Sequence, residues 1–147
     1  MARTFVRATL HLQERRLNIY HPAIEKQKKL VERIHAAGQF AMGNMPCTVW
    51  ETAWYAWGME NIMMDMVAEP ELAEFVLDTV TENAVIRAVN YAKAGADGLY
   101  LGDDIGMQST PMMSLELYRT YLKPRLKKVI DAARIANERR PDLAIEG

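Results

Sequence analysis

The feature that most constrains the fold is an alternation of short apolar segments with long segments of helical periodicity. Residues 39–44 (QFAMGN) are short, apolar and followed by turn-forming residues, as a buried strand is. Residues 98–102 (GLYLG) predict a second strand, buried on both faces. Between them, residues 70–95 repeat apolar side chains near the helical period, begin at Pro70 and close at Gly95. Strand, helix, strand in this order indicates a parallel sheet with crossover helices.

Two further segments of the N-terminal half also predict helices. Residues 21–38 carry an apolar stripe, and Gly38 suits a C-terminal cap. Residues 47–69 are dense in tryptophan and methionine, and we expect Gly58 to divide them into two short helices. The helical segments therefore outnumber the strands.

The C-terminal third continues the alternation. Ser114 is a good N-cap for a helix, and we expect Pro124 to break or kink that helix because proline lacks a backbone donor. Residues 143–147 (LAIEG) begin another strand pattern, whereas residues 1–20 match neither period and are interpreted as an arm. We interpret residues 1–147 as one α/β domain, and expect it to be a small open domain or a piece of a larger one.

Composition and charge exclude several classes of function. The 18 basic and 19 acidic side chains give a net charge of -1, with no basic stripe, so nucleic-acid binding is not expected. No apolar run reaches the length of a membrane span, and no signal peptide is evident. The single cysteine, Cys47, cannot form an internal disulfide and is interpreted as a small buried residue, so we expect a cytoplasmic location.

Two adjacent carboxylates follow the second predicted strand. In parallel α/β proteins, ligands bind at the carboxyl ends of the strands, where Asp103 and Asp104 lie. Neighbouring strand residues point to opposite sides, so one aspartate would face a ligand and the other would support it. We predict an acid, base or hydrogen-bonding role for the pair; structural loop capping is the alternative. Two neighbours supply too few oxygens for Mg²⁺, so no metal site is predicted.

Other candidate ligand-binding residues follow the first predicted strand. Asn44 ends that strand and can hydrogen-bond a ligand, and Glu51 lies just beyond it. The alternative for Glu51 is a first-turn acid that complements the helix dipole. Trp54 and Tyr55 could stack on a flat macrocycle, although aromatic residues at helical spacing more often lie in a core or an interface.

Several motifs in register resemble one family. They are the turn GNMPCT after a strand, the segment AGADG, the acidic strand end GDDIGMQS, and SLELYRTYLKPRLKKVIDA. Over residues 39–137 the chain resembles the middle of the uroporphyrinogen decarboxylase superfamily, which also contains the cobamide-dependent methyltransferases. The resemblance implies parallel (β/α) units of a TIM barrel, here a partial barrel. The aspartate pair followed by Gln108 resembles the methyltransferase-like branches, which adds Gln108 to the substrate-binding candidates.

The resemblance implies decarboxylation of a tetrapyrrole side chain, or corrinoid-dependent methyl transfer, with substrate in the barrel mouth. Neither the family's RQAGR arginine loop nor its HxC zinc motif occurs here, so activity of this chain alone is an open question. No cofactor is expected in this chain, while a complete methyltransferase would carry zinc and a corrinoid. The alternative is a non-catalytic fragment or small-molecule binding module. Because an open barrel exposes sheet edges, we expect a homodimer or higher oligomer.

Overall fold

The computed structural model describes residues 20–138. The strand predicted at 143–147 and all but the last residue of the predicted arm lie outside the described residues. The elements run in the order α2 (Tyr20–Ala36), β1 (Met42–Met45), α3 (Trp50–Trp57), α4 (Met59–Ala68), α5 (Pro70–Ala94), β2 (Gly98–Leu101), α6 (Leu115–Leu117), the π-helical turn η1 (Tyr118–Leu122) and α7 (Lys123–Glu138).

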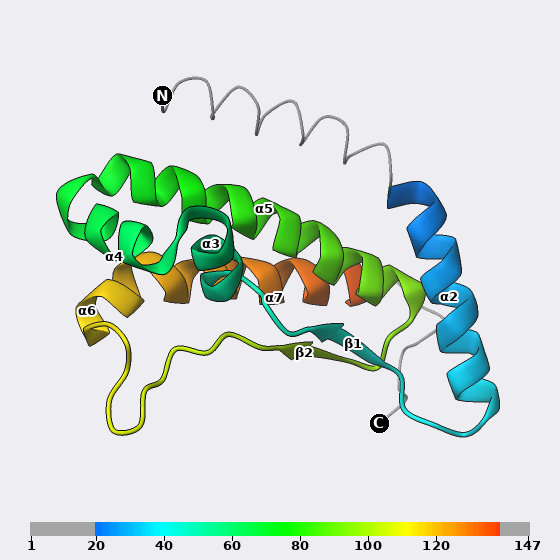
Figure 1. The fold of residues 1–147 in the computed structure, drawn as a ribbon. Coiled ribbons are helices and arrows are strands. Elements are labelled where there is room, and N and C mark those ends of the chain that lie inside the picture. The colour runs from blue at the N-terminus through cyan, green and yellow to red at the C-terminus, as the bar shows by residue number, and fades with distance from the viewer. Residues whose placement is uncertain (1–19, 139–147) are drawn as a thin grey trace.

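Strands β1 and β2 form a parallel pair, with Met42 opposite Gly98 and Met45 opposite Leu101. The intervening chain contains α5, which runs back along the sheet (Figure 1). A parallel pair cannot be joined by a tight hairpin and needs such a crossover. The alternation of strand and helix predicted for this part of the chain is therefore confirmed, in a mixed α/β fold that is mostly helical.

The helices cover one face of this sheet. Along β1, Gly43 and Met45 are buried while Met42 and Asn44 are exposed. On β2, Tyr100 is 54% exposed, so the prediction that this strand is buried on both faces is wrong. The physical reason is that α5 and its neighbours pack on one side only, and among residues 20–138 no helix lies above the side chains that alternate to the other side.

The core lies between the sheet and the helices. Helix α5 packs most extensively against α7, and α3 and α4 pack on its N-terminal half (Figure 1). At the surface Arg125 of α7 pairs with Asp78 of α5 at 2.8 Å, and Lys128 pairs with Glu82 at 2.6 Å. The largest fully buried apolar side chains of the described residues are Trp50, Met45, Ile62, Leu77, Leu122, Val49 and Val129.

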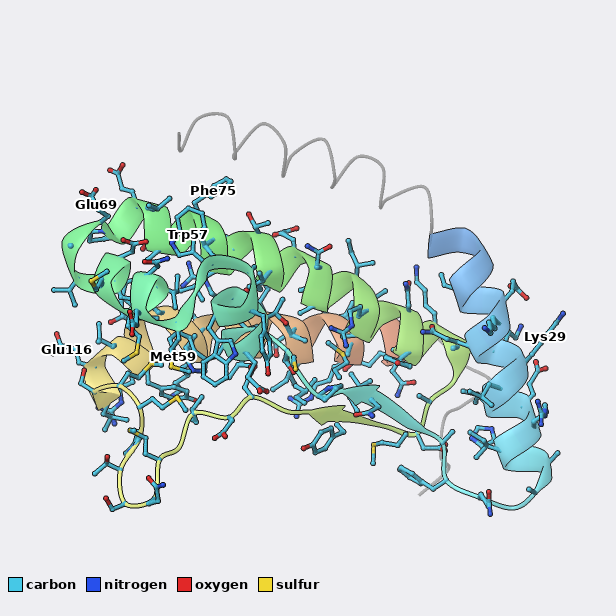
Figure 2. All side chains as sticks on the ribbon, in the orientation of Figure 1. Lys29, Trp57, Met59, Glu69, Phe75 and Glu116 are labelled. Carbon is cyan, nitrogen blue, oxygen red and sulfur yellow. The ribbon has the colours of Figure 1, made fainter. Side chains whose placement is uncertain are left out.

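Helix α2 forms a separate small cluster at the other end of α5. Val31 and Ile34 pack with Ala41 and Ala94, apart from the main core. Lys29 projects from α2 away from the rest of the molecule (Figure 2). The helix ends at Ala36, and Gly38 follows with φ 69°, which confirms the predicted glycine cap.

Two other glycines end helices as predicted. Gly58 has φ 93° and separates α3 from α4, and Gly95 adopts the left-handed conformation after α5. A side chain at either position would be strained by the positive φ. The boundaries of these helices therefore follow from the sequence.

The expected disturbance near Pro124 takes the form of a π turn rather than a sharp break. Ser114 caps the helix, because its Oγ accepts the N–H of Leu117 at 3.2 Å. In η1 the N–H of Lys123 bonds the carbonyl of Tyr118, five residues back. Pro124 then falls in the first turn of α7, where a missing donor is tolerated, so widening the preceding turn accommodates the proline.

No helix within residues 20–138 combines the length and the apolar character that crossing a membrane requires.

Candidate functional site

The carboxyl ends of the two strands are locked together. Gly102 donates its N–H to the carbonyl of Met45 at 3.0 Å, and its own carbonyl accepts the N–H of Thr48 at 3.1 Å. The Thr48 hydroxyl donates to the Met45 carbonyl at 2.9 Å. A Cβ atom on Gly102 would lie 2.5 Å from the carbonyl oxygen of Pro46. Only glycine fits at the point where the segments around Gly102 and Pro46 cross.

Asp103 caps the N-terminus of α3. The residue at the N-cap position is Val49, whose side chain cannot accept a hydrogen bond. Instead, Asp103 Oδ1 accepts the N–H groups of Thr48 at 3.2 Å, Val49 at 3.2 Å and Glu51 at 3.1 Å, and Oδ2 accepts that of Val49 at 3.0 Å. A carboxylate also complements the positive end of the helix dipole. The cap therefore comes from a residue far along the chain.

Asp104 has different surroundings. Its side chain is exposed, and Oδ1 accepts the N–H of Gly106 at 3.2 Å. Counting along the chain, Asp103 continues the side of Leu99 and Leu101, which pack against the core, whereas Asp104 continues the side of the exposed Tyr100. The two neighbouring carboxylates thus lie on opposite sides. Whether either contacts a ligand stays a prediction.

Glu51 and Cys47 lie next to Asp103, both half-buried. The Cys47 thiol hydrogen-bonds to Glu51, and its pKa is raised above the ordinary 9.0 by burial first and then by the negative charges of Glu51 and Asp103. The charge of Arg87 acts in the opposite direction. We call Cys47, Glu51, Asp103 and Asp104 the strand-end site. At neutral pH its thiol is protonated and donates a hydrogen bond rather than attacking as a thiolate.

Arg87 of α5 is a member of these surroundings that sequence reasoning missed. Its Nη1 donates to the carbonyl of Cys47 at 3.4 Å, and the Thr52 hydroxyl donates to the same carbonyl at 2.9 Å. No basic group lies near Cys47 in the sequence, because the arginine is on another helix. No local signal could have found it.

Asn44 lies on the open face of the sheet. Its side chain is exposed, and in the strand register it is opposite Tyr100, which is also exposed. The backbone carbonyl of Asn44 accepts a hydrogen bond from the Tyr91 hydroxyl at 3.2 Å. Its side-chain amide is therefore presented on the same face of the sheet as Tyr100.

Gln108 lies at the tip of the loop that follows β2. The loop folds back on itself, with an antiparallel bridge between Gly106 and Pro111 and a 2.7 Å hydrogen bond from Met107 N–H to the Thr110 carbonyl. Gln108 is exposed at this turn. The loop begins at the strand-end site but keeps the Gln108 side chain on the surface.

The two predicted stacking residues differ in burial. Trp54 is half-buried, packs against the core, and meets Trp50 edge-on with ring centroids 5.7 Å apart. Tyr55 is 73% exposed and meets Trp54 at an interplanar angle of 84°. Trp54 thus contributes to the core, which was the alternative interpretation of its helical spacing. Tyr55 touches Trp54 but presents most of its ring at the surface.

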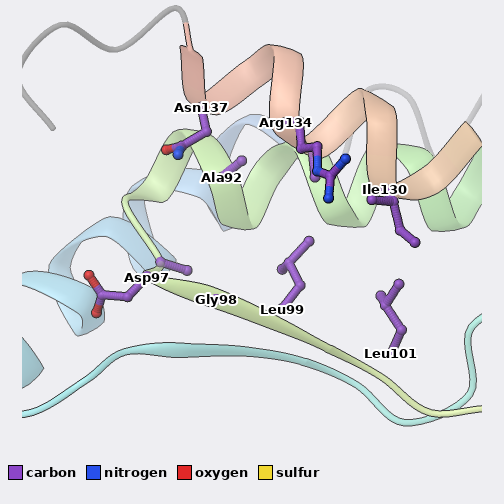
Figure 3. Close-up of a pocket in the computed structure, with 10 residues that line it drawn as sticks. Ala92, Asp97, Gly98, Leu99, Leu101, Ile130, Arg134 and Asn137 are labelled. Carbon is purple, nitrogen blue, oxygen red and sulfur yellow. The ribbon is translucent and has the colours of Figure 1, made fainter. Parts of the chain in front are cut away.

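A cavity of about 450 Å³ lies elsewhere, between β2, the end of α5 and α7 (Figure 3). Leu99 and Leu101 point from β2 toward Ile130 and Arg134 of α7. The cavity is on the helix-covered side of β2, and none of the seven predicted site residues lines it. It is therefore separate from the strand-end site.

The described residues contain no metal-binding set of side chains. Among the side chains that the structure describes, no three histidine, cysteine, aspartate or glutamate residues converge to hold a metal ion. Cys47 has only carboxylates and an arginine around it. The described residues therefore do not fit the zinc site that a methyltransferase implies.

A model of a known protein family matches most of the chain. The family model described as uroporphyrinogen decarboxylase (URO-D) matches residues 11–142 of the 147-residue chain. The matched stretch includes every described element and all the predicted site residues. No curated protein and no solved structure matches the chain.

Proposed function

The chain belongs to the uroporphyrinogen decarboxylase family, and from this we propose that it forms part of an enzyme of that superfamily. Its substrate would be a tetrapyrrole whose side chain is decarboxylated, or a methyl donor or acceptor in corrinoid-dependent transfer. The parallel strands and the helical crossover support an origin in the (β/α) units of a partial TIM barrel. The observation that carries the proposal is that Asp104 is exposed just past the carboxyl end of β2, next to Asp103, which accepts the N–H of Glu51.

In this proposal the substrate lies over the open face of the sheet, at the carboxyl ends of β1 and β2. Asp104 would act there as acid, base or hydrogen-bond acceptor, and a porphyrinogen offers pyrrole N–H groups that a carboxylate can accept. Glu51, Asn44 and Gln108 would contribute further polar contacts, with Tyr55 as an aromatic surface. The support for this arrangement is the exposure of Asp104, Asn44 and Gln108.

The methyl-transfer branch makes a different demand on the protein. It implies zinc and a corrinoid in the complete enzyme, and zinc would supply a Lewis acid that activates the methyl acceptor. The described residues do not fit such a site, so no step through zinc is assigned to them. Decarboxylation makes no demand for a metal, and we propose it as the first activity to test.

The experiment incubates the full chain with uroporphyrinogen and separates the products by chromatography according to their number of carboxyl groups. We expect loss of carboxyl groups in the wild type and a fall of about a hundredfold in Asp104→Asn, the magnitude typical of a lost acid or base. Asp97→Asn, a carboxylate at the opposite end of the sheet, is the matched control and should retain activity. A wild type that neither converts uroporphyrinogen nor binds uroporphyrin or cobalamin would contradict the proposal.

A second candidate function is a small-molecule binding module that works as an oligomer. The open sheet face exposes Phe40 by 64% and Met42 by 54%, next to Tyr100, and a contiguous apolar surface of this kind marks an interaction site. We propose a homodimer or higher oligomer that covers this face, in a reducing cytoplasm that suits the lone Cys47. Sedimentation equilibrium tests it: a folded monomer over a wide concentration range would rule out the oligomer.

A further inference from the structure

We propose that Asp103 is a positioning residue that holds Glu51 for the ligand, and that Asp104 is the aspartate that faces the ligand. This inference rests on the proposed function, because it divides the work of the same strand-end site between two neighbouring carboxylates. It is carried by the way in which Asp103 is bound to α3.

The hydrogen-bond acceptors of Asp103 are already in use. Both carboxylate oxygens are engaged, and all four hydrogen bonds come from backbone N–H groups of three residues at the start of α3. The N–H groups of Val49 and Glu51 have no acceptor at the helix's own N-cap, because that residue is Val49, whereas the Thr48 N–H is shared with the Gly102 carbonyl. A ligand that bound Asp103 would have to displace the end of a helix. Asp103 is therefore placed to hold the start of α3 and not to bind a ligand.

The helix end that Asp103 caps carries Glu51. Glu51 lies in the first turn of α3, and its own N–H is one of the groups that Asp103 accepts, at 3.1 Å. The Glu51 side chain reaches the Cys47 thiol in the turn that precedes the helix. Loss of the Asp103 carboxylate would free this turn, and Glu51 and Cys47 would both shift.

Asp103 and Asp104 face different surroundings. Thr48, whose N–H bonds both the Gly102 carbonyl and Asp103, is buried, so Asp103 faces the helix-covered side. Asp104 is exposed and accepts one N–H, that of Gly106, which leaves oxygen lone pairs free for a ligand. The two carboxylates therefore have separate tasks although they are adjacent in sequence.

The decisive experiment is a double-mutant cycle between Asp103 and Glu51, with the binding of uroporphyrin to the full chain measured by tryptophan fluorescence. We expect Asp103→Asn to weaken binding about tenfold in the wild-type background, and less than about twofold when Glu51→Gln is already present. A positioning residue acts through its target, so removal of the target removes its effect. An equal loss in both backgrounds would show that Asp103 contacts the ligand itself and would overturn the proposal.

A second readout needs no ligand: the rate at which Ellman's reagent modifies the Cys47 thiol. We expect Asp103→Asn to raise this rate severalfold, because the turn is released and a negative charge beside the thiol is removed. Asp97→Asn is the matched control, since it also loses a carboxylate that accepts a backbone N–H, and its rate should equal that of the wild type. If Asp103→Asn fails to fold, the measurement uses Asp103→Ser instead, because serine keeps one acceptor oxygen.

The two readouts separate the two proposals. A wild type that does not bind uroporphyrin refutes the proposed substrate, while the thiol rates still report whether Asp103 holds the turn. Unchanged thiol rates in folded Asp103 variants would overturn the positioning role even if uroporphyrin binds.

Discussion

Each end of the two-stranded sheet is fastened by an aspartate, but the two fastenings differ. At the amino end, Asp97 Oδ2 accepts the N–H of Ala41 at 2.7 Å and pairs with His35 Nε2 at 2.9 Å. At the carboxyl end, Asp103 accepts four hydrogen bonds from the start of α3. Asp97 joins one backbone group and one side chain, whereas Asp103 joins only backbone groups.

The difference shows where the molecule is built for rigidity. The His35 and Asp97 side chains are 37% and 32% exposed, and an exposed ion pair contributes about 0–1 kcal/mol to stability. The carboxyl end combines a charged cap with the close crossing of Gly102 and Pro46. That end is also the one where parallel α/β proteins bind ligands, and a ligand site needs residues held in a fixed position.

The largest loss of stability is expected from a substitution at the carboxyl end of the sheet, at Gly102. Gly102→Ala would place a Cβ 2.5 Å from the Pro46 carbonyl oxygen and 3.1 Å from its Cα, so we expect a loss of about 3 kcal/mol in the free energy of unfolding. Urea denaturation measures it. Gly106→Ala is the matched control: the nearest atom to its added Cβ is 4.0 Å away, and its stability should change little. Similar losses in both variants would contradict the close crossing.

The next effect removes the cap. Asp103→Ala leaves the N–H groups of Val49 and Glu51 without their acceptor and leaves the Thr48 N–H with the Gly102 carbonyl alone, so we expect a loss of about 2 kcal/mol, at the upper end of helix-capping values. Asp97→Ala should cost about 1 kcal/mol, since it removes one backbone acceptor and an exposed pair. Urea denaturation of the two variants gives the comparison. A larger loss for Asp97→Ala would reverse our ranking of the two ends.

The contribution of Asp97 at the amino end of the sheet should be lost at acidic pH. The pKa of Asp97 is lowered below its ordinary 3.8, mainly by the Ala41 N–H and then by the hydrogen bond from His35. A lowered carboxyl pKa gives stability that is complete above the unfolded value and is lost as pH falls through the folded value. We expect wild-type stability to decline below about pH 4 more steeply than that of Asp97→Asn. Parallel curves for the two proteins from pH 5 to pH 2 would contradict this.

The smallest effect isolates the side-chain partner. His35→Gln removes the imidazole that bonds Asp97, an ion pair when the imidazole is protonated, but leaves the Ala41 hydrogen bond, so we expect a loss of about 0.5 kcal/mol at low salt. Thermal unfolding at low and high ionic strength measures it, because salt screens an exposed pair. A loss as large as that of Asp97→Ala would mean that His35, and not Ala41, is the main partner.

Much of the architecture could be predicted because its signals are local. Gly38, Gly58 and Gly95 each end a helix at a positive φ, which is a property of the residue itself. The parallel pairing of residues 42–45 with 98–101 followed from the alternation of short strands with a long helix. The aspartate pair was also found as a candidate by its position after a strand.

The parts that could not be predicted depend on residues far apart in sequence. Tyr100 was expected to be buried, but burial depends on which layers cover a sheet, and only one face is covered in the described residues. Pro124 indicated a disturbed helix, but the π turn that absorbs it depends on how η1 packs. Arg87 approaches Cys47 from another helix.

Asp103 and Asp104 illustrate what the residue order predicts and what depends on packing. The order of residues already shows that two carboxylates follow a strand and, through strand alternation, that they point in opposite directions. Which of the two faces the protein depends on packing: Asp103 turns toward the start of α3 and Asp104 toward solvent. The reason is physical: Val49 cannot cap its own helix, and the parallel register brings Asp103 next to the unsatisfied N–H groups.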